Sequence, residues 1–172
     1  MTDEIAISGI KISPPALALQ LRTDSATSDL TPRLCRLLTI ARVNIAFMTA
    51  IGQAPHTYTL CCIDPDQREK VTHMVDQDAQ LKASITYGSV LGLLTLYPHR
   101  GSLQLLGLAV QALSDAGIAI YGLASSIAAL TVAIDFSRLE EAAALLAERF
   151  DLPRNPPPVQ PGITVRQEKR IR

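Results

Sequence analysis

A short polar run, His99-Arg100-Gly101-Ser102, contains residue types that bind small anions. It comes directly before residues 103–116, whose apolar spacing predicts a helix. The start of a helix presents unpaired backbone N–H groups and the positive end of the helix dipole, and an Arg guanidinium binds a carboxylate or phosphate through paired hydrogen bonds. The run therefore has the chemistry of an anion site, and an ordinary solvated loop is the alternative interpretation.

The other reactive side chains do not form the pattern of a catalytic or metal centre. Cys35, Cys61 and Cys62 make an odd count, and the adjacent pair points to opposite faces of any strand. The three histidines are scattered rather than spaced as metal ligands. Glu140 and Glu141 are neighbours on a predicted helix and are typical of a solvated face. We therefore expect buried, reduced thiols, no metal, no cofactor and no enzymatic activity.

Composition restricts the class of protein further. Of the 172 residues, 48% are apolar and 19% are charged, and 16 basic residues balance 16 acidic ones. Such a chain has enough apolar residues for a core and lacks the basic excess typical of proteins that bind nucleic acids or anionic membranes. The weakly polar stretch Ser84–Tyr97 is shorter than the roughly 20 residues of a membrane helix. Asp3 and Glu4 are unlike the start of a signal peptide, so we expect a cytoplasmic protein.

The elements that would position these residues follow one order twice. Aliphatic runs with some alternation predict strands, and apolar residues at helical spacing predict helices that begin near Thr31-Pro32 and Asp64-Pro65. The first set of predicted strands is 4–12, 16–22, 44–50 and 57–63, with a candidate closing strand at 81–87. The second set is a strand at 90–96, a helix at 103–116, strands at 118–123 and 128–134, and a helix at 136–150.

Two alignments within the chain indicate an internal duplication. Residues 43–45 match 118–120, and residues 63–64 match 134–135. A β-α-β-β-α order followed by another strand is the ferredoxin-like arrangement. We predict an α+β fold of two tandem ferredoxin-like (βαββαβ) domains, 1–82 and 83–152, each an antiparallel sheet with helices on one face. Residues 153–172 are a Pro-rich tail, either an added edge strand or a frayed basic end.

Several segments resemble the tandem ACT domains in the C-terminal regulatory region of aspartokinases. They are Ser8-Gly9-Ile10, Ala41-Arg42-Val43-Asn44-Ile45, the run from Gln111 to Ile120, Ala124-Ser125-Ser126-Ile127 and Leu130–Asp135. The resemblance covers roughly residues 5–152, and the kinase domain of that family is absent. It implies a free-standing regulatory or sensor protein that binds a free amino acid, of the Lys or Thr class, where two ACT domains lie side by side.

The resemblance also implies the residues of the site. In that family, the loop between the first strand and the first helix binds the effector, and the facing domain contributes its second strand. The candidates in this chain are Asp24, Ser25, Ser28, Asp29 and Asn44 in the first repeat, and Arg100, Gly101, Ser102, Ala119, Ser125 and Ser126 in the second. Asn44 has a side-chain amide for an α-ammonium group, whereas Ala119 has no side-chain acceptor.

The chain departs from the family at the effector loops. The Pro-Gly pair that usually precedes the helix is replaced by Ser28-Asp29 and by Leu103-Gln104, and the Asp29 carboxylate would repel an effector carboxylate if it faced the site. A ligand-free interaction scaffold built from a degenerate ACT pair is therefore the alternative function. Apolar helices and sheet edges that two small domains cannot fully cover predict a homodimer.

Overall fold

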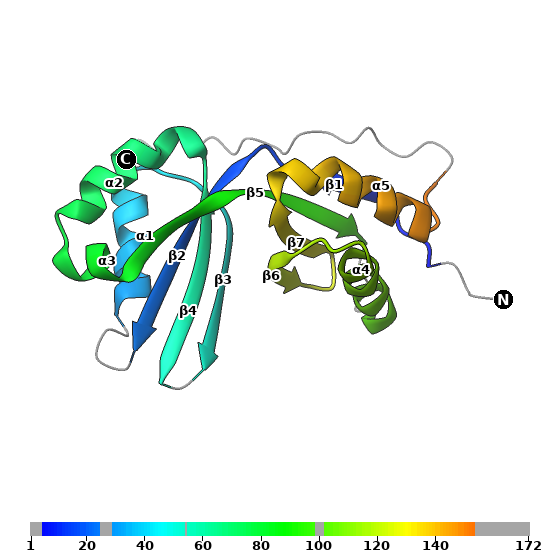
Figure 1. Cartoon of the computed structure of the whole chain (residues 1–172), viewed down its shortest axis with the longest axis horizontal. Coiled ribbons are helices and arrows are strands. Elements are labelled where there is room, and N and C mark those ends of the chain that lie inside the picture. Colours follow the sequence, from blue (N-terminus) through cyan, green and yellow to red (C-terminus); the bar gives the residue numbers. More distant parts are fainter. Residues whose placement is uncertain (1–4, 25–28, 54, 99–101, 154–172) are drawn as a thin grey trace, which may run out of the picture.

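The computed structural model describes residues 5–24, 29–53, 55–98 and 102–153, which form an α+β fold. Figure 1 shows helices at the two ends of the molecule with the strands between them. The elements are β1 (Gly9–Ile12), β2 (Ala16–Asp24), α1 (Leu30–Ile40), β3 (Ile45–Gln53), β4 (His56–Ile63), a 3-10 turn (Pro65–Gln67), α2 (Arg68–Asp76), α3 (Ala79–Ser84), β5 (Ile85–Tyr97), α4 (Leu103–Asp115), β6 (Ile120–Ser125), β7 (Leu130–Asp135), a second 3-10 turn (Phe136–Arg138) and α5 (Leu139–Arg149).

One long strand connects the two ends of the molecule. The strand order is β3-β4-β2-β5-β7-β6, with β1 also on β5, and every pairing is antiparallel. The 13-residue β5 pairs with β2 through residues 85–91 and with β7 through residues 91–96. β1 pairs with residues 94–97 of the same strand. We call β2, α1, β3, β4, α2, α3 and the start of β5 the first half, and the end of β5, α4, β6, β7, α5 and β1 the second half.

Each half has its own core between its sheet and its helices. In the first half, Leu30, Leu34 and Leu38 recur every four residues on α1 and pack with Leu19 and Ile63 of the sheet. In the second half, the buried positions on α4 are Leu105, Ala109 and Leu113, and those on α5 are Leu139, Ala142 and Leu146. The apolar spacing that predicted these helices is therefore the spacing that fills the two cores.

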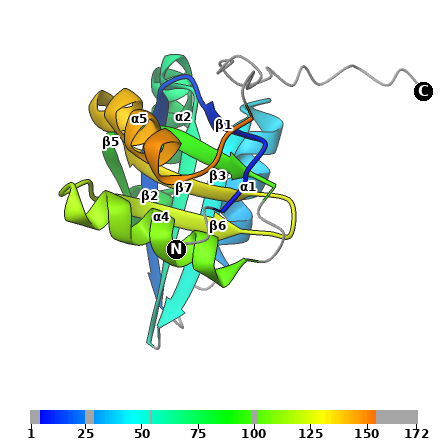
Figure 2. The ribbon, with the colours of Figure 1, turned by 90° about the vertical axis from the view of Figure 1, so that its right-hand side faces the viewer.

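A third cluster lies where the sheet faces without helices meet. It contains Ala16, Ala18, Phe47, Leu60, Cys62, Leu91, Leu93 and Ala133. Gly122 of β6 permits this contact, because a Cβ atom there would lie 2.9 Å from both Leu60 Cδ2 and Phe47 Cε1. Figure 2 shows the strands of the second half running across those of the first. The two halves thus share β5 and this buried apolar junction.

Most predicted elements are confirmed, with two corrections. The strand predicted over 81–87 is wrong at its start, because Leu81–Ser84 belong to α3, where the Asp78 side chain accepts hydrogen bonds from the Gln80 and Leu81 backbone N–H groups. The segments predicted at 81–87 and 90–96 contribute to one continuous β5. Helix α1 begins at Leu30 rather than after Thr31, and the Thr31 hydroxyl instead lies 3.1 Å from that of Thr59.

The ends of the chain differ from the prediction as well. Of the strand predicted over 4–12, only β1 is a regular strand, and Ala6 forms an isolated parallel bridge with Asp151. Residues 154–172 of the tail lie outside the described residues. Cys61 and Cys62 are fully buried free thiols, and burial raises the pKa of Cys61 to about 12 and that of Cys62 to about 11, so both stay protonated. Cys35 is only partly buried.

Candidate functional site

The first-repeat candidates lie at both ends of the first half. Asp24 ends β2 opposite His56, and Asp29 directly precedes α1. Asn44 precedes Ile45, which pairs with Ile63, the partner of Leu17 near the start of β2. Asn44 is therefore at the opposite end of the sheet from Asp24 within one chain. Ser25 and Ser28 lie outside the described residues.

The second-repeat candidates fall at the two ends of the second half. Ser102 begins α4, and its Oγ accepts the Leu105 backbone N–H at 3.1 Å. Ser125 ends β6, and Ser126 closes the turn to β7, with its Oγ accepting the Ala129 N–H at 3.1 Å. Ala119 lies before β6 at the other end. Arg100 and Gly101 lie outside the described residues.

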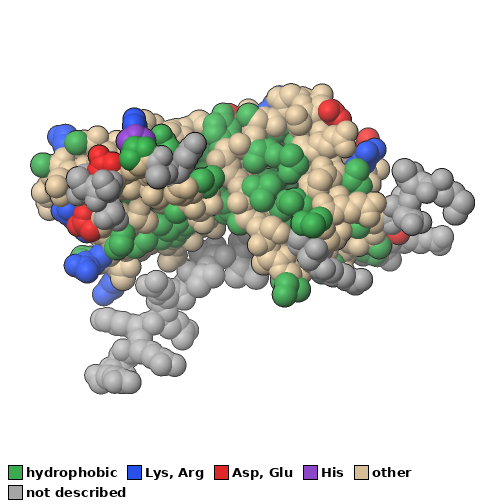
Figure 3. Space-filling view, turned by 90° about the horizontal axis from the view of Figure 1, so that it is seen from below, with side chains coloured by type: hydrophobic (Ala, Val, Ile, Leu, Met, Phe, Trp, Pro, Cys, Tyr) green, Lys and Arg blue, Asp and Glu red, His purple; other side chains and the backbone are tan. Residues whose placement is uncertain are grey.

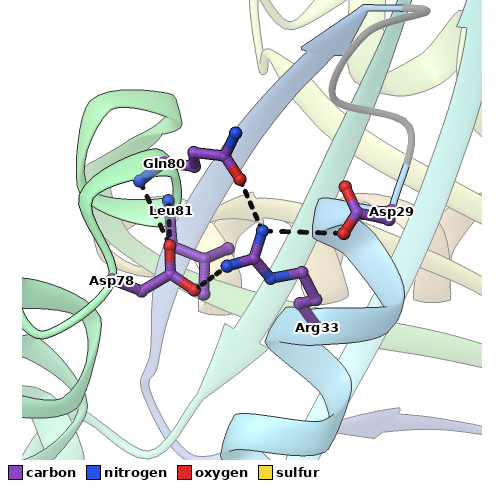
Figure 4. A network of polar contacts seen from close by, with 5 residues as sticks. All are labelled: Asp29, Arg33, Asp78, Gln80 and Leu81. Carbon is purple, nitrogen blue, oxygen red and sulfur yellow. Dashed lines mark hydrogen bonds and ion pairs between the residues drawn. The ribbon is translucent and has the colours of Figure 1, made fainter.

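Arg33 connects the start of α1 with the start of α3, as Figure 4 shows. Its Nη1 donates to Gln80 Oε1 at 2.6 Å and lies 3.5 Å from Asp29 Oδ2, while its Nη2 pairs with the Asp78 carboxylate. The backbone N–H of Leu81 and the Arg33 guanidinium hold the pKa of Asp78 below its usual value. Because the Asp29 carboxylate is directed toward Arg33, its charge is partly compensated.

Two adjoining surface hollows lie on the first half, where β2 and β5 meet the end of α3. One, of about 330 Å³, is lined by Arg22, Thr23, Asp24, His56, Ala83, Ser84 and Thr86. The other, of about 350 Å³, lies further along the sheet face and includes Tyr121 of β6. They share Arg22, Ser84 and Thr86. Asp24 is thus the sequence-predicted residue that the structure places at a hollow.

Sequence reasoning missed three side chains of these hollows, those of Arg22, His56 and Tyr58. Arg22 Nη2 lies 2.9 Å from His56 Nε2, and Arg22 Cζ lies 5.9 Å from the centroid of the Tyr58 ring. Because Arg only donates, Nε2 accepts and the proton of the neutral ring is on Nδ1. The polar alternation Gln20, Arg22, Asp24 along β2 was the available signal, since it places all three on one face.

No group of three or more His, Cys, Asp and Glu side chains in the described ranges is placed to hold a metal ion. None of the helices in those ranges combines the length and apolarity that a membrane span requires. What the site offers is an exposed carboxylate, an Arg guanidinium and a helix start at one end of the sheet.

Comparison with known proteins identifies the fold. No family model and no curated protein sequence matches the chain. Among solved structures, the regulatory subunit of aspartate kinase from Thermus thermophilus in its ligand-free form superposes with a TM-score of 0.74 and 12% identity, covering 85% of this chain and 99% of that one. The chain has the fold of an aspartokinase regulatory subunit. The tandem-ACT resemblance seen in the sequence is confirmed at this level.

Two further structures place this fold in larger proteins. A chain from a structure of the aspartokinase alpha and beta subunits matches with a TM-score of 0.72 and 16% identity, over 84% of this chain and 98% of that one. Aspartokinase III from E. coli, in complex with lysine and aspartate, matches with a TM-score of 0.63 and 11% identity, over 88% of this chain and 35% of the kinase. The superpositions thus span nearly the whole of the shorter chains and about a third of the kinase chain.

Proposed function

We propose that the chain consists of two ferredoxin-like units that share β5. The order β3-β4-β2-β5 gives the first unit, and β6-β7-β5-β1 repeats that pattern with the N-terminal β1 as the closing strand. The division predicted between residues 82 and 83 then falls inside α3, close to the start of β5, and β1 belongs with the second unit.

Matching helix ends support this duplication. Arg42 at φ 54° follows α1, and Gly117 at φ 66° follows α4. The next residues donate equivalent hydrogen bonds, from Val43 N to Leu38 O at 2.9 Å and from Ile118 N to Leu113 O at 2.8 Å. At each helix end a basic side chain donates a hydrogen bond to a backbone carbonyl: Lys70 Nζ donates to Ala41 O, and Arg138 Nη2 donates to Ala116 O.

The function we propose is that of a non-enzymatic regulatory or sensor protein that binds a free amino acid in the first unit. The observation that carries the proposal is the end-to-end match with isolated aspartokinase regulatory subunits. The local chemistry supports it: the exposed Asp24 carboxylate suits an α-ammonium group. The start of α1, where the Asp29 side chain makes no capping hydrogen bond, suits an α-carboxylate.

A homodimer would complete such a site. β3 is an edge strand whose partner in the described chain is β4. If two β3 edges pair antiparallel, Asn44 of one copy approaches the Gln53 end of the other, which is the end where Asp24 lies. This arrangement gives Asn44 the effector-binding role that it cannot have within one chain, with Lys and Thr as the first ligands to test.

The interaction scaffold remains the second candidate because large apolar side chains are exposed. Leu103 is 79% and Ile127 is 83% exposed, and Figure 3 shows hydrophobic side chains gathered on the half that contains β6 and α4. A surface of this kind favours a protein partner.

Thermal unfolding in the presence of each of the twenty amino acids, with light scattering on the same samples, distinguishes the two functions. We expect at least one amino acid to raise the unfolding temperature of a dimer, by an amount that depends on its concentration. Asp24→Asn should remove this shift, and Glu140→Gln, a matched change of an exposed acid on α5, should leave it unchanged. A dimer that responds to no amino acid would support the scaffold instead.

A further inference from the structure

The larger hollow differs from the Asp24 site in its chemistry and in the elements that form it. Its walls come from β2, β3, β4 and β5 of the first half and from Tyr121 of the second. Its volume of about 350 Å³ lies in the range of small-molecule sites, about 300–1,000 Å³. Of the described residues that line it, Arg22 is charged and none is acidic.

The Arg22 guanidinium is held in place on this face. His56 Nε2 accepts one of its N–H groups at 2.9 Å, and the Tyr58 ring lies beneath it, with 6.3 Å between the His56 and Tyr58 ring centroids. The ion pairs formed among the described residues do not include Arg22. Arg22 therefore has remaining N–H donors, which suit a carboxylate.

Apolar side chains lie next to this cation although they face water. Ile51 is 65% exposed, Tyr58 is 47% exposed and Tyr121 is 45% exposed. In the pairing of β6 with β7, Ile120 is opposite Ile134 and Gly122 is opposite Ala133, so Tyr121 is the extra residue of a β-bulge. Bulges redirect side chains and are frequent beside functional sites. Here the bulged Tyr121 lines a hollow that belongs mainly to the other half.

We propose that this hollow is a second ligand site, for a small monocarboxylate that carries a flat apolar group and has no α-ammonium group. The carboxylate pairs with Arg22, and the apolar group lies among Ile51, Tyr58 and Tyr121. Because no described acidic side chain lines the hollow, an ammonium group there has no ion-pair partner. The lack of an acidic lining residue distinguishes this site from the amino-acid site proposed at Asp24. A ligand that touches Tyr121 would contact both halves of the molecule.

Calorimetric titration of the full chain with 3-phenylpropanoate tests the proposal. We expect saturable binding with a dissociation constant on the order of 1 mM. 3-Phenylpropionamide has the same shape without the charge, and phenylalanine adds an ammonium group, so each should bind this site about tenfold more weakly. The absence of saturation by 3-phenylpropanoate, or equal binding of the uncharged amide, would overturn the proposal.

Variants locate the site. Arg22→Gln should weaken the binding of 3-phenylpropanoate about tenfold, and Tyr121→Ala should weaken it about fivefold. Arg36→Gln, a matched change of an exposed Arg on α1, should leave binding unchanged. Asp24→Asn should not weaken the binding of 3-phenylpropanoate, although we expect it to remove the rise in unfolding temperature caused by an amino acid. Binding that is insensitive to both Arg22→Gln and Tyr121→Ala would overturn the proposal even if an amino acid binds at Asp24.

Discussion

The two halves of the molecule end their first helices alike and begin them differently. After α1 and α4, the chain turns through left-handed residues, Arg42 and Gly117, with equivalent hydrogen bonds. At the start of α4, Ser102 caps the helix, whereas Asp29 does not cap α1 and is directed toward Arg33. The matching helix ends support the duplication proposed above, while the difference in helix starts favours the first half as the ligand-binding half.

The largest expected effects test whether the halves differ in stability as well as in chemistry. Leu34→Ala and Leu113→Ala each remove a fully buried side chain, one from each helical core, and each should cost about 2–5 kcal/mol in the free energy of unfolding. Because β5 and the third cluster join the halves, both variants should lower one common transition in thermal and denaturant unfolding. Two separate transitions would show that the halves unfold independently.

The difference between the helix starts predicts a smaller effect. Ser102→Ala removes the hydroxyl that accepts the Leu105 N–H and should lower stability by about 1 kcal/mol. Asp29→Ala removes no capping bond and should cost a few tenths of a kcal/mol, because it loses an exposed ion pair. Urea unfolding of the two variants side by side measures the difference, and equal losses would remove the contrast between the halves.

Charge at the start of α3 predicts a contribution of Asp78 to the pH dependence of stability. The folded-state pKa of Asp78 is lowered by the Leu81 N–H and by Arg33, so its stabilisation is present above its unfolded pKa of about 3.9 and is lost as the pH falls through the folded value. Asp78→Asn keeps a capping oxygen but loses the ion pair. The stability advantage of the wild type over Asp78→Asn should be present at pH 6 and decrease as the pH falls below the unfolded pKa of the carboxyl group. An advantage that stays constant over this range would contradict this assignment.

The matched helix ends predict stability changes of opposite sign in the two halves. Arg42→Gly places a residue without a Cβ in a left-handed conformation and should raise stability by about 0.5 kcal/mol. Gly117→Arg makes the reverse change and should lower it by about 1 kcal/mol. Thermal unfolding of both variants tests this expectation. Changes in unfolding temperature of the same sign in the two variants would contradict it.

Local spacing predicted most elements, and long-range pairing accounts for what was missed. The period of Leu30, Leu34 and Leu38 is visible in the sequence because one helix face must be apolar. Leu81 continues the apolar alternation of the strand that follows it, so the sequence predicts a strand there. In the structure Leu81 is the buried residue of α3. The pairing of β1 with β5 was not predictable, since alternation gives the buried face of a strand and not its partner.

The candidate site divides in the same way. Asp24 was predicted because it lies between the first strand and the first helix, in the loop that the family resemblance assigns to the effector. Asp29 and Arg33 are four residues apart on one helix face. Arg22 and His56 are 34 residues apart and meet through strand register, which the sequence alone does not give. Asp78 meets Arg33 through the packing of α3 on α1, 45 residues away.

Calorimetric titration of amino acids into three proteins, the wild type, Asp24→Asn and Ser102→Ala, tests the central claim that the first half binds the effector. We expect saturable heat from at least one amino acid with the wild type, its loss in Asp24→Asn, and unchanged affinity in Ser102→Ala. Binding that survives Asp24→Asn but is lost in Ser102→Ala would assign the site to the second half and contradict this claim.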